Sequence, residues 1–480
     1  MAKQMYIYLK AHIRRLVLKS VKNIPAIILV VTILWQCIVY AFMTPLFIRA
    51  YASDIDDIIF SVNQTVVSEQ TTQTSQNVIP LHARFAALID GETNRLLYGK
   101  DANIKAPNAS TTKIMTLITA LEICDDDYIV TTSAYAASMP DVQLNAVKGE
   151  QFRIKDLYYS LMLKSHNDTA VIIAENAAYY YICSLNDKTR NELPYDLSFI
   201  NNYSVDSAFI KDISKEQSKT LVHIFTDIMN QKALELNCIN THFVTPNGLD
   251  ASDENGIHQT TAYDLSVIMS YCIKNVRFLD ITQTKSYNFS NLSGKTYAVT
   301  NANAFLSMYD NIISGKTGFT ADAGYCYVCA YKDNDKTFIV ALLACGWPNN
   351  KTYKWSDART LLDYARNNYN KQIILDNKKT FNVKINNAKT DSININFNEN
   401  YSTYISQNDY VNIEYNIPEC IEAPVKKGDI LGTVTIYINK EAVKQYTINS
   451  DIDINKCSYW NNISDIIRHF LCFLCVFLIY

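Results

Sequence analysis

Residues 106–118 read Ala-Pro-Asn-Ala-Ser-Thr-Thr-Lys-Ile-Met-Thr-Leu-Ile, and the rest of the chain is organised around them. Apolar residues follow Lys113 at helical spacing, so we predict a helix that begins near Ser110. The three-residue spacing puts the Ser110 hydroxyl and the Lys113 amine on one helix face, about one turn apart. A helix N-terminus favours negative charge, and an amine in a dry pocket can lose its proton and act as a base. The pair therefore predicts a serine nucleophile activated by a lysine; the alternative is an N-cap serine followed by a solvated lysine.

Two further short motifs follow in the chain. Ser165-His-Asn167 lies between two predicted amphipathic helices, and a loop held in this way can aim a hydroxyl and an amide into a cleft. Lys316-Thr-Gly318 precedes a predicted strand at 325–331, and its glycine lets a ligand backbone approach closely. Ser-x-x-Lys, Ser-x-Asn and Lys-Thr-Gly in this order are the signature of penicillin-binding proteins and serine β-lactamases.

Beyond these motifs, the chain resembles the low-molecular-mass penicillin-binding proteins, specifically the serine-type D-alanyl-D-alanine carboxypeptidases. The likeness covers residues 81–458 and rests on further stretches: Asp90-Gly-Glu-Thr, His242-Phe-Val-Thr-Pro-Asn-Gly-Leu-Asp, Thr261-Ala-Tyr-Asp-Leu, Asn301-Ala-Asn, Ala323-Gly-Tyr and Ala423-Pro-Val-Lys-Lys-Gly-Asp. The resemblance implies an α/β (α+β) transpeptidase domain of the penicillin-binding and β-lactamase type, with an antiparallel sheet flanked by helices. A small all-β C-terminal domain would follow it.

The resemblance also implies catalytic roles for four residues. Ser110 would attack the carbonyl between two D-alanines of a peptidoglycan stem peptide and form an acyl-enzyme, with Lys113 as the general base. Ser165 would relay a proton to the leaving amine, while Asn167 would hold the substrate amide and orient Lys113. Water would then release the acyl group. Penicillin and other β-lactam antibiotics would acylate the same serine.

Substrate binding is implied for Lys316, Thr317, Gly318 and Phe319. Lys316 and Thr317 would bind the terminal carboxylate of the peptide. The backbone N–H groups of Ser110 and Phe319 would form an oxyanion hole, in which each donor contributes about 10²–10³ in rate. The implied reaction uses no cofactor and no metal ion.

Other activities are built on related residues. A DD-endopeptidase or DD-transpeptidase would use the same motifs, so only the reaction products separate these enzymes. A class A β-lactamase needs a glutamate that activates the deacylating water, and no segment between Ser165 and Lys316 matches that motif. A catalytically inactive wall-binding protein would not need the intact serine, lysine and asparagine motifs. A Ser-His-Asp hydrolase and a metallopeptidase are disfavoured because the G-x-S-x-G and H-E-x-x-H patterns are absent.

Three features depart from the family pattern. His166 stands where glycine or alanine is usual, and its larger ring is expected to line or crowd the cleft. Residues 180–215 are irregular and longer than their counterpart in the family, so we interpret them as an insertion that can reshape access. The apolar N-terminal run resembles an anchor more than the usual cleaved signal.

Both ends of the chain are apolar. The first 23 residues contain six Lys or Arg and no acid, and residues 24–48 then carry no charge, which is long enough to span a bilayer. Positive charge before such a run predicts a cytoplasmic N-terminus and a catalytic domain on the outer face of the cell membrane. We favour an uncleaved signal/anchor helix within residues 1–52, although Ala50-Tyr-Ala52 also resembles a signal-peptidase site. Residues 459–480 are predicted to form a membrane-associated terminal helix.

Composition and patterning predict the domain limits and argue against some kinds of partner and metal site. We predict a polar linker at 53–80, the catalytic domain at 81–371 and a β-sandwich at 372–458, where short alternating runs replace the helical periodicity. The formal charge of −3 and the lack of a basic patch with interleaved aromatics argue against a nucleic-acid partner. The twelve cysteines form no disulfide framework, and the C-x-x-C at Cys326 lacks the second pair of a zinc site.

Overall fold

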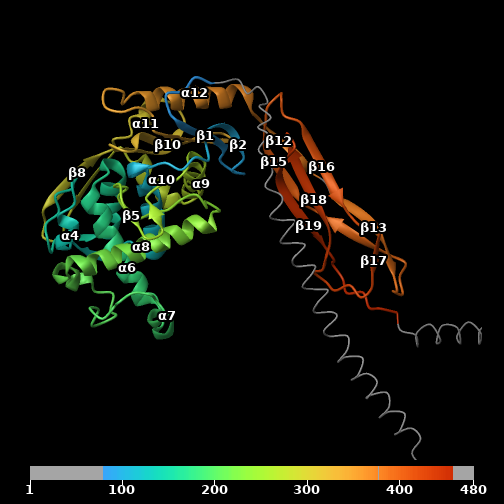
Figure 1. The fold of residues 1–480 in the computed structure, drawn as a ribbon, viewed down its shortest axis with the longest axis horizontal. Coiled ribbons are helices and arrows are strands. Elements are labelled where there is room, and N and C mark those ends of the chain that lie inside the picture. The colour runs from blue at the N-terminus through green and yellow to red at the C-terminus, as the bar shows by residue number, and fades with distance from the viewer. Residues whose placement is uncertain (1–78, 377, 458–480) are drawn as a thin grey trace, which may run out of the picture. The chain divides into compact units, whose positions relative to one another are not determined.

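The computed structural model describes residues 79–376 and 378–457 (Figure 1). The predicted signal/anchor at 24–48, nearly all of the polar linker at 53–80 and the predicted terminal helix at 459–480 lie outside these residues. No helix among the described residues is long and apolar enough to cross a bilayer. Both membrane attachments therefore stay predictions.

An antiparallel sheet of five strands, in the order β2-β1-β11-β10-β9, forms the centre of the catalytic domain. Its strands are β1 (Phe85–Asp90), β2 (Leu96–Lys100), β9 (Ile312–Thr320), β10 (Gly324–Asp333) and β11 (Lys336–Leu343). The N-terminal hairpin therefore pairs with the last strand of the domain, and β9 is the edge strand. The Lys-Thr-Gly motif lies in this edge strand.

Helices cover both faces of the sheet (Figure 1). α12 (Tyr353–Asn368) packs on β10 and β11, and α9 (Ala262–Cys272) packs on β1 and β11. Residues 338–343 of β11 are all fully buried, because alternate side chains point to one helical layer or the other. This run of six buried residues explains why the strand reads as continuously apolar in the sequence.

The other half of the catalytic domain is helical. α6 (Asn167–Ser184) runs through its core and is buried on nearly every face. α3 (Lys113–Ile123), α5 (Ile154–Tyr159) and α8 (Lys215–Glu235) pack around it. A capping box fixes the start of α8, because Ser214 and Gln217 each accept a hydrogen bond from the other's backbone N–H.

Short elements connect these layers within the described catalytic residues. They are η1 (Ala109–Thr112), β3 (Ile129–Thr131), α4 (Ala134–Ala137), β4 (Gln151–Arg153), η2 (Ser160–Lys164), α7 (Asp187–Asn191), η3 (Ser207–Asp212), β5 (Ser252–Asp253), β6 (Gly256–Ile257), α10 (Val276–Gln283), β7 (Ser286–Ser290), β8 (Thr296–Thr300) and α11 (Phe305–Met308). The region predicted as irregular, 180–215, thus contains α7 and η3 and the last turn of α6.

Two local predictions differ from the structure. The helix predicted from Ser110 begins only at Lys113, after the 3-10 turn η1. The helix predicted before Ser165 changes at Ser160 into a π-helical turn, η2. The strand predicted at 325–331 is β10, which follows the Lys-Thr-Gly motif as expected, while the motif itself lies in β9, a strand that was not predicted. The two distorted turns lie next to the predicted site, where contacts from distant segments override local propensity.

The C-terminal region is all-β. Its strands are β12 (Asn370–Asp376), β13 (Lys379–Asn386), β14 (Ser392–Phe397), β15 (Asn400–Ile405), β16 (Val411–Asn416), β17 (Cys420–Glu422), β18 (Ile430–Ile438) and β19 (Glu441–Asn449). Alternate residues of these strands, such as Val383 and Ile385, form a core of their own. β15 meets the catalytic domain, where the Thr403 hydroxyl donates to Asp90 Oδ2 at 2.8 Å. The predicted fold class is confirmed, whereas the exact domain limits stay predictions.

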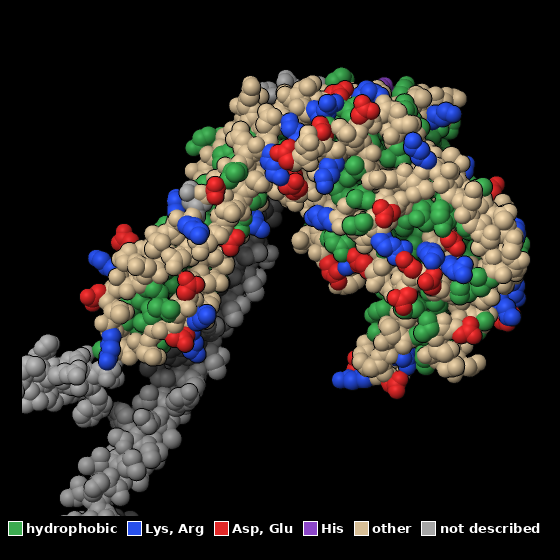
Figure 2. Space-filling view, turned by 180° about the vertical axis from the view of Figure 1, so that it is seen from behind, with side chains coloured by type: hydrophobic (Ala, Val, Ile, Leu, Met, Phe, Trp, Pro, Cys, Tyr) green, Lys and Arg blue, Asp and Glu red, His purple; other side chains and the backbone are tan. Residues whose placement is uncertain are grey.

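Charged side chains of both signs are interspersed over the face shown in Figure 2. This mixture agrees with the formal charge of −3 of the chain.

Candidate active site

Ser110, the predicted nucleophile, lies in the 3-10 turn η1. The Asn108 side chain holds this turn, since its Nδ2 donates to Thr112 Oγ1 at 2.9 Å and to Thr111 Oγ1 at 3.2 Å. Both threonines are buried, whereas Ser110 is only partly buried. The turn thus presents the serine hydroxyl at the start of a buried helix.

Two glycines let other segments approach this turn. A β-carbon at Gly318 of β9 would lie 2.9 Å from the backbone nitrogen of Ser110. At Gly248, where φ is +82°, a β-carbon would lie 2.0 Å from the carbonyl oxygen of Ala109. Side chains cannot be accommodated at such distances, so only glycine allows the edge strand and the 244–250 segment to lie against the nucleophile.

Lys113 is completely buried beneath Ser110. Its Nζ lies 2.8 Å from Ser110 Oγ, 2.9 Å from Asn167 Oδ1 and 2.6 Å from the carbonyl oxygen of Asn247. Burial lowers the pKa of Lys113 well below its usual value; the charge of Lys316 lowers it further and Asp168 opposes the shift. The site therefore favours a neutral amine.

The three partners of Lys113 suit that neutral form. A neutral amine has two N–H donors and one lone pair. Asn167 Oδ1 and the Asn247 carbonyl can only accept, so they take the two donors. The lone pair is then left for Ser110, whose hydroxyl can donate to it. Lys113 is thus placed as an acceptor for the serine proton.

Asn167 is fixed before any substrate binds. Its Nδ2 donates to the carbonyl oxygens of Pro140 and Asp141 at 3.1 and 3.0 Å, which directs Oδ1 toward Lys113. Its backbone N–H donates to the Val142 carbonyl at 2.7 Å. These contacts agree with the predicted orienting role of Asn167. Its predicted contact with the substrate amide stays a prediction, because both donors of the side-chain amide already have partners.

Ser165 and Lys316 form a second serine–lysine pair. Ser165 follows the π-helical turn in the left-handed conformation, at φ 67°. Lys316 Nζ donates to Ser165 Oγ at 2.8 Å and to the Thr317 carbonyl at 2.7 Å. The lysine is nearly fully buried, and burial lowers its pKa to about 7. A modest change of environment therefore decides whether Lys316 is charged.

The remaining predicted binding residues follow along β9. Thr317 is half-buried and Gly318 is buried against the nucleophile turn. The Phe319 side chain is 43% exposed, so it stands at the surface next to the site. Since β9 is the edge strand of its sheet, backbone groups on its outer side face the nucleophile turn rather than another strand.

His166 differs from what its position suggested. The ring is buried, and its Nδ1 lies 2.8 Å from Ser160 Oγ in the π-helical turn. Burial lowers its pKa to about 4, so the ring is neutral at physiological pH. His166 therefore supports the turn that presents Ser165.

Sequence reasoning missed two supports of the nucleophile. Asn247 supplies the carbonyl that holds Lys113. His258 joins two segments, because its Nδ1 accepts from the Val244 backbone N–H at 3.0 Å while its Nε2 lies 2.8 Å from Thr112 Oγ1. Burial lowers the pKa of His258 to about 3, which keeps it neutral. The only signal was the likeness of 242–250 to the family, which does not reveal these contacts.

No metal site accompanies these groups in the part of the chain that the structure describes. There, no three His, Cys, Asp or Glu side chains gather in a way that could hold an ion. The chemistry that the arrangement offers is a serine beside a buried amine, facing a second serine and a second lysine. Such a site can form and hydrolyse an acyl-enzyme.

Known proteins resemble this chain in sequence and in fold. The family model described as D-alanyl-D-alanine carboxypeptidase matches residues 70–189 and 221–345. The chain belongs to this family. A second model, penicillin-binding protein 5, C-terminal domain, matches residues 369–456. The predicted family membership is therefore confirmed.

Curated relatives span most of the chain. It is 26% identical to the D-alanyl-D-alanine carboxypeptidase DacF of Bacillus subtilis over 386 residues, which cover 78% of this chain and 87% of the relative. A D-alanyl-D-alanine endopeptidase of Escherichia coli is 23% identical over 282 residues, or 58% of this chain and 76% of the relative. The relatives thus include a carboxypeptidase and an endopeptidase, two activities that the motifs do not distinguish.

Solved structures share the fold. Penicillin-binding protein 5 from Haemophilus influenzae superposes with a TM-score of 0.59 at 19% identity, covering 79% of this chain and all (100%) of that one. The carboxypeptidase DacD from Francisella tularensis gives a TM-score of 0.54 at 21% identity, with 79% and 95% covered. At these identities the likeness concerns the fold alone.

Proposed function

We propose that this protein is a serine D-alanyl-D-alanine carboxypeptidase that removes the terminal D-alanine from peptidoglycan stem pentapeptides. The observation that carries this proposal is the fully buried Lys113 amine, 2.8 Å from the hydroxyl of Ser110. Family membership supports the reaction class. The same site would be acylated by penicillin, whose strained amide stands in for the D-Ala-D-Ala bond.

In the proposed acylation step, Ser110 Oγ bonds to the carbonyl carbon while its proton passes to the lone pair of Lys113. The negative oxygen that forms is stabilised by the backbone N–H groups of Ser110 and Phe319. Collapse of this intermediate breaks the C–N bond. The proton held by Lys113 passes through Ser165 to the leaving D-alanine amine, which leaves Lys113 neutral again.

In the proposed deacylation step, water attacks the ester carbon and gives a proton to Lys113. The ester C–O bond breaks, and that proton returns to Ser110 Oγ. Release of the shortened peptide restores the starting site. Lys113 accepts the proton of Ser110 in the first step and that of water in the second, so it serves as the base in both half-reactions.

Lys316 and Thr317 are proposed to hold the terminal carboxylate. An ammonium group has three donors, and Lys316 directs two of them to Ser165 and the Thr317 carbonyl. The third is available to a ligand. A bound carboxylate would also favour the charged form of Lys316, whose pKa burial lowers to about 7.

The test is to incubate the full-length protein with a D-Ala-D-Ala pentapeptide and, separately, with a cross-linked dimeric stem peptide. Release of free D-alanine from the pentapeptide supports the carboxypeptidase. Cleavage of the dimer alone would identify an endopeptidase, an activity found by name in one relative. Hydrolysis of penicillin with rapid turnover and no D-alanine release would indicate a β-lactamase instead.

We further propose that the catalytic domain lies on the outer face of the cell membrane. The support is the charge-free run at 24–48 after a basic N-terminal segment, together with the apolar residues 459–480. Deleting 459–480 should leave the protein in the membrane fraction if the first run is retained. Soluble protein shortened at its N-terminus would show that the run is a cleaved signal.

A further inference from the structure

Residues 140–147 lie beside the candidate active site and belong to no helix or strand. They meet the site at Asn167, whose Nδ2 donates to the carbonyl oxygens of Pro140 and Asp141. The position of these two carbonyl groups matters, because it directs Asn167 Oδ1 toward Lys113. Since no strand pairs with this segment, its backbone N–H groups must find other partners that fix it in place.

Two buried carboxylates supply those partners. Asp168 accepts hydrogen bonds from the backbone N–H groups of Leu144, at 2.9 Å to Oδ1, and of Ala146, at 3.2 Å to Oδ2. Glu150 Oε2 accepts from the Val147 N–H at 2.9 Å. Asp168 is 1% exposed and Glu150 is 6% exposed, so water competes little for these bonds. The segment is therefore held by side chains instead of by a neighbouring strand.

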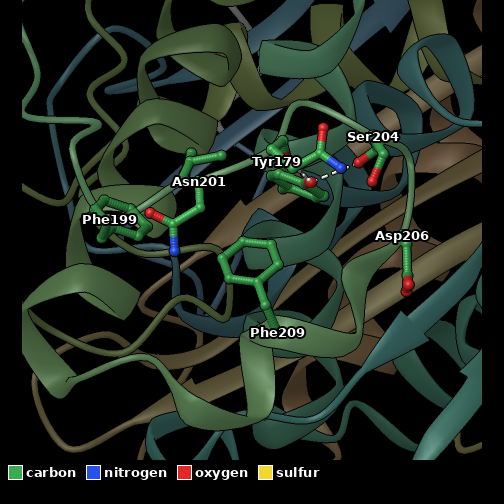
Figure 3. Close-up of a pocket in the computed structure, with 8 residues that line it drawn as sticks. Tyr179, Phe199, Asn201, Ser204, Asp206 and Phe209 are labelled. Carbon is green, nitrogen blue, oxygen red and sulfur yellow. Dashed lines mark hydrogen bonds between the residues drawn. The ribbon is translucent and has the colours of Figure 1, made fainter.

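Asp168 is itself presented by a well-fixed helix. It lies in the first turn of α6, where a negative charge is favourable, and α6 is buried on nearly every face. Further along the helix, the Tyr179 hydroxyl lies within hydrogen-bond distance of the carbonyl oxygens of Asn202 and Ser204 (Figure 3). Because the helix is held at a distance from its first turn as well, the Asp168 carboxylate has a defined position.

The charge of Asp168 also acts on Lys113. It opposes the lowering of the Lys113 pKa that burial and the charge of Lys316 cause. The other titratable groups around these residues are His166 before α6, His258, Tyr297 of β8, and Glu150 with Lys295 beyond Tyr297. Burial keeps the two histidine rings neutral at pH 7 by lowering their pKa values. Asp168 is thus the carboxylate that influences the charge of Lys113.

We propose that Asp168 is a positioning residue of this site, which holds residues 140–147 in place and thereby keeps Asn167 Oδ1 against Lys113. The proposal rests on the proposed function, because the amine that is positioned is the base of that reaction. Asp168 acts through other residues, since both of its carboxylate oxygens are occupied by backbone N–H groups of its own chain.

The test is Asp168→Asn in the full-length protein in detergent, a change that keeps the size of the side chain. An amide has one acceptor oxygen, and its NH₂ group cannot accept from a backbone N–H, so one of the two bonds to the segment is lost. Acylation by penicillin at its optimum pH should slow about tenfold through the misplaced Asn167. Because the removed charge favours charged Lys113, the acid limb of acylation should move to lower pH, by about half a unit or more.

Glu150→Gln separates the two effects of Asp168. It weakens the hold on the same segment, so acylation should again slow, but the acid limb should stay in place because the carboxylate that acts on Lys113 is Asp168. Asp357→Asn is the matched control, since Asp357 is also 1% exposed and accepts the Ala83 backbone N–H in another part of the domain. It should change neither the rate nor the acid limb.

Hydrogen exchange measures the hold on the segment without any reaction. By mass spectrometry, the peptide that contains residues 141–147 should exchange its amide hydrogens about tenfold faster in Asp168→Asn than in wild-type protein or Asp357→Asn. Unchanged exchange of this peptide, or an unshifted acid limb in Asp168→Asn, would overturn the proposal. If wild-type protein is neither acylated nor releases D-alanine while exchange changes as expected, the hold by Asp168 stands and the proposed function is wrong.

Discussion

Two serine–lysine pairs face each other in this protein, and they differ in how their lysines are held. Every group on the Lys113 nitrogen has a partner: Asn167 and Asn247 accept its two N–H groups, and the Ser110 hydroxyl donates to its lone pair. Lys316 bonds to Ser165 and to its neighbour's carbonyl, which leaves one donor for a ligand. Both lysines are buried, yet one is a fixed internal group and the other an incomplete binding site. The comparison teaches that burial alone does not decide whether a lysine acts as a base or binds an anion. The number of hydrogen-bond partners around its nitrogen also matters.

The largest expected effect comes from removing the nucleophile. Ser110→Ala should abolish penicillin labelling and lower D-alanine release by about 10⁴-fold or more, because no acyl-enzyme can form. Mass spectrometry of labelled wild-type protein should place the adduct on the peptide that contains Ser110. Labelling that persists in Ser110→Ala would show that the first pair is not the reactive one.

Removing the base should have the next largest effect. Lys113→Ala is expected to slow acylation at least about 10²-fold, the scale of losing a positioned base. Loss of the amine also leaves Asn167 Oδ1 and the Asn247 carbonyl without a donor, so thermal unfolding must be measured beside the kinetics. Unchanged acylation in a folded variant would mean that another group takes the serine proton.

Lys316→Met tests the other half of the comparison. Loss of a charge-assisted hydrogen bond to carboxylate should lower kcat/KM for the pentapeptide about 10- to 100-fold, chiefly by raising KM. Because the Lys316 charge lowers the pKa of Lys113, its removal should raise that pKa and move the acid limb of acylation to higher pH. A large fall in kcat with an unaltered KM would contradict the assigned role.

The pH dependence should separate the two lysines in wild-type protein. Acylation requires neutral Lys113, so it should increase as pH rises through the lowered pKa of that group. Carboxylate binding requires charged Lys316, which loses its proton above about 7. The ratio of kcat/KM for the pentapeptide acid to that for its C-terminal amide should therefore fall several-fold as pH rises past neutrality. A constant ratio would place the carboxylate elsewhere.

The smallest effect is expected at His258, which supports only the first pair. His258→Gln should lower the free energy of unfolding by about 1–3 kcal/mol through the backbone N–H groups left without an acceptor. Acylation should slow modestly while KM for the pentapeptide stays constant. Chemical denaturation and steady-state kinetics measure the two effects. A changed KM would show that His258 also supports the second pair.

The sequence by itself determined the family, the fold class and the motif residues. Ser110 and Lys113 are neighbours along the chain, so their spacing alone predicts that they meet. The alternation of the late strands and the buried run of β11 likewise follow from local periodicity. The sequence did not predict the 3-10 and π-helical turns that present the two serines, because these distortions depend on contacts from other segments.

Only the tertiary structure decided how the lysines are held. Asn167 and Asn247 are 54 and 134 residues from Lys113, and nothing in their local sequence shows that both oxygens converge on one amine. The depressed pKa of Lys113 comes from burial and from Lys316, which are properties of the folded chain. His166 illustrates the same limit, since its motif position suggested the cleft whereas packing turned its ring to Ser160. Residue types are local, but desolvation and hydrogen-bond partners are set by segments that only folding brings together.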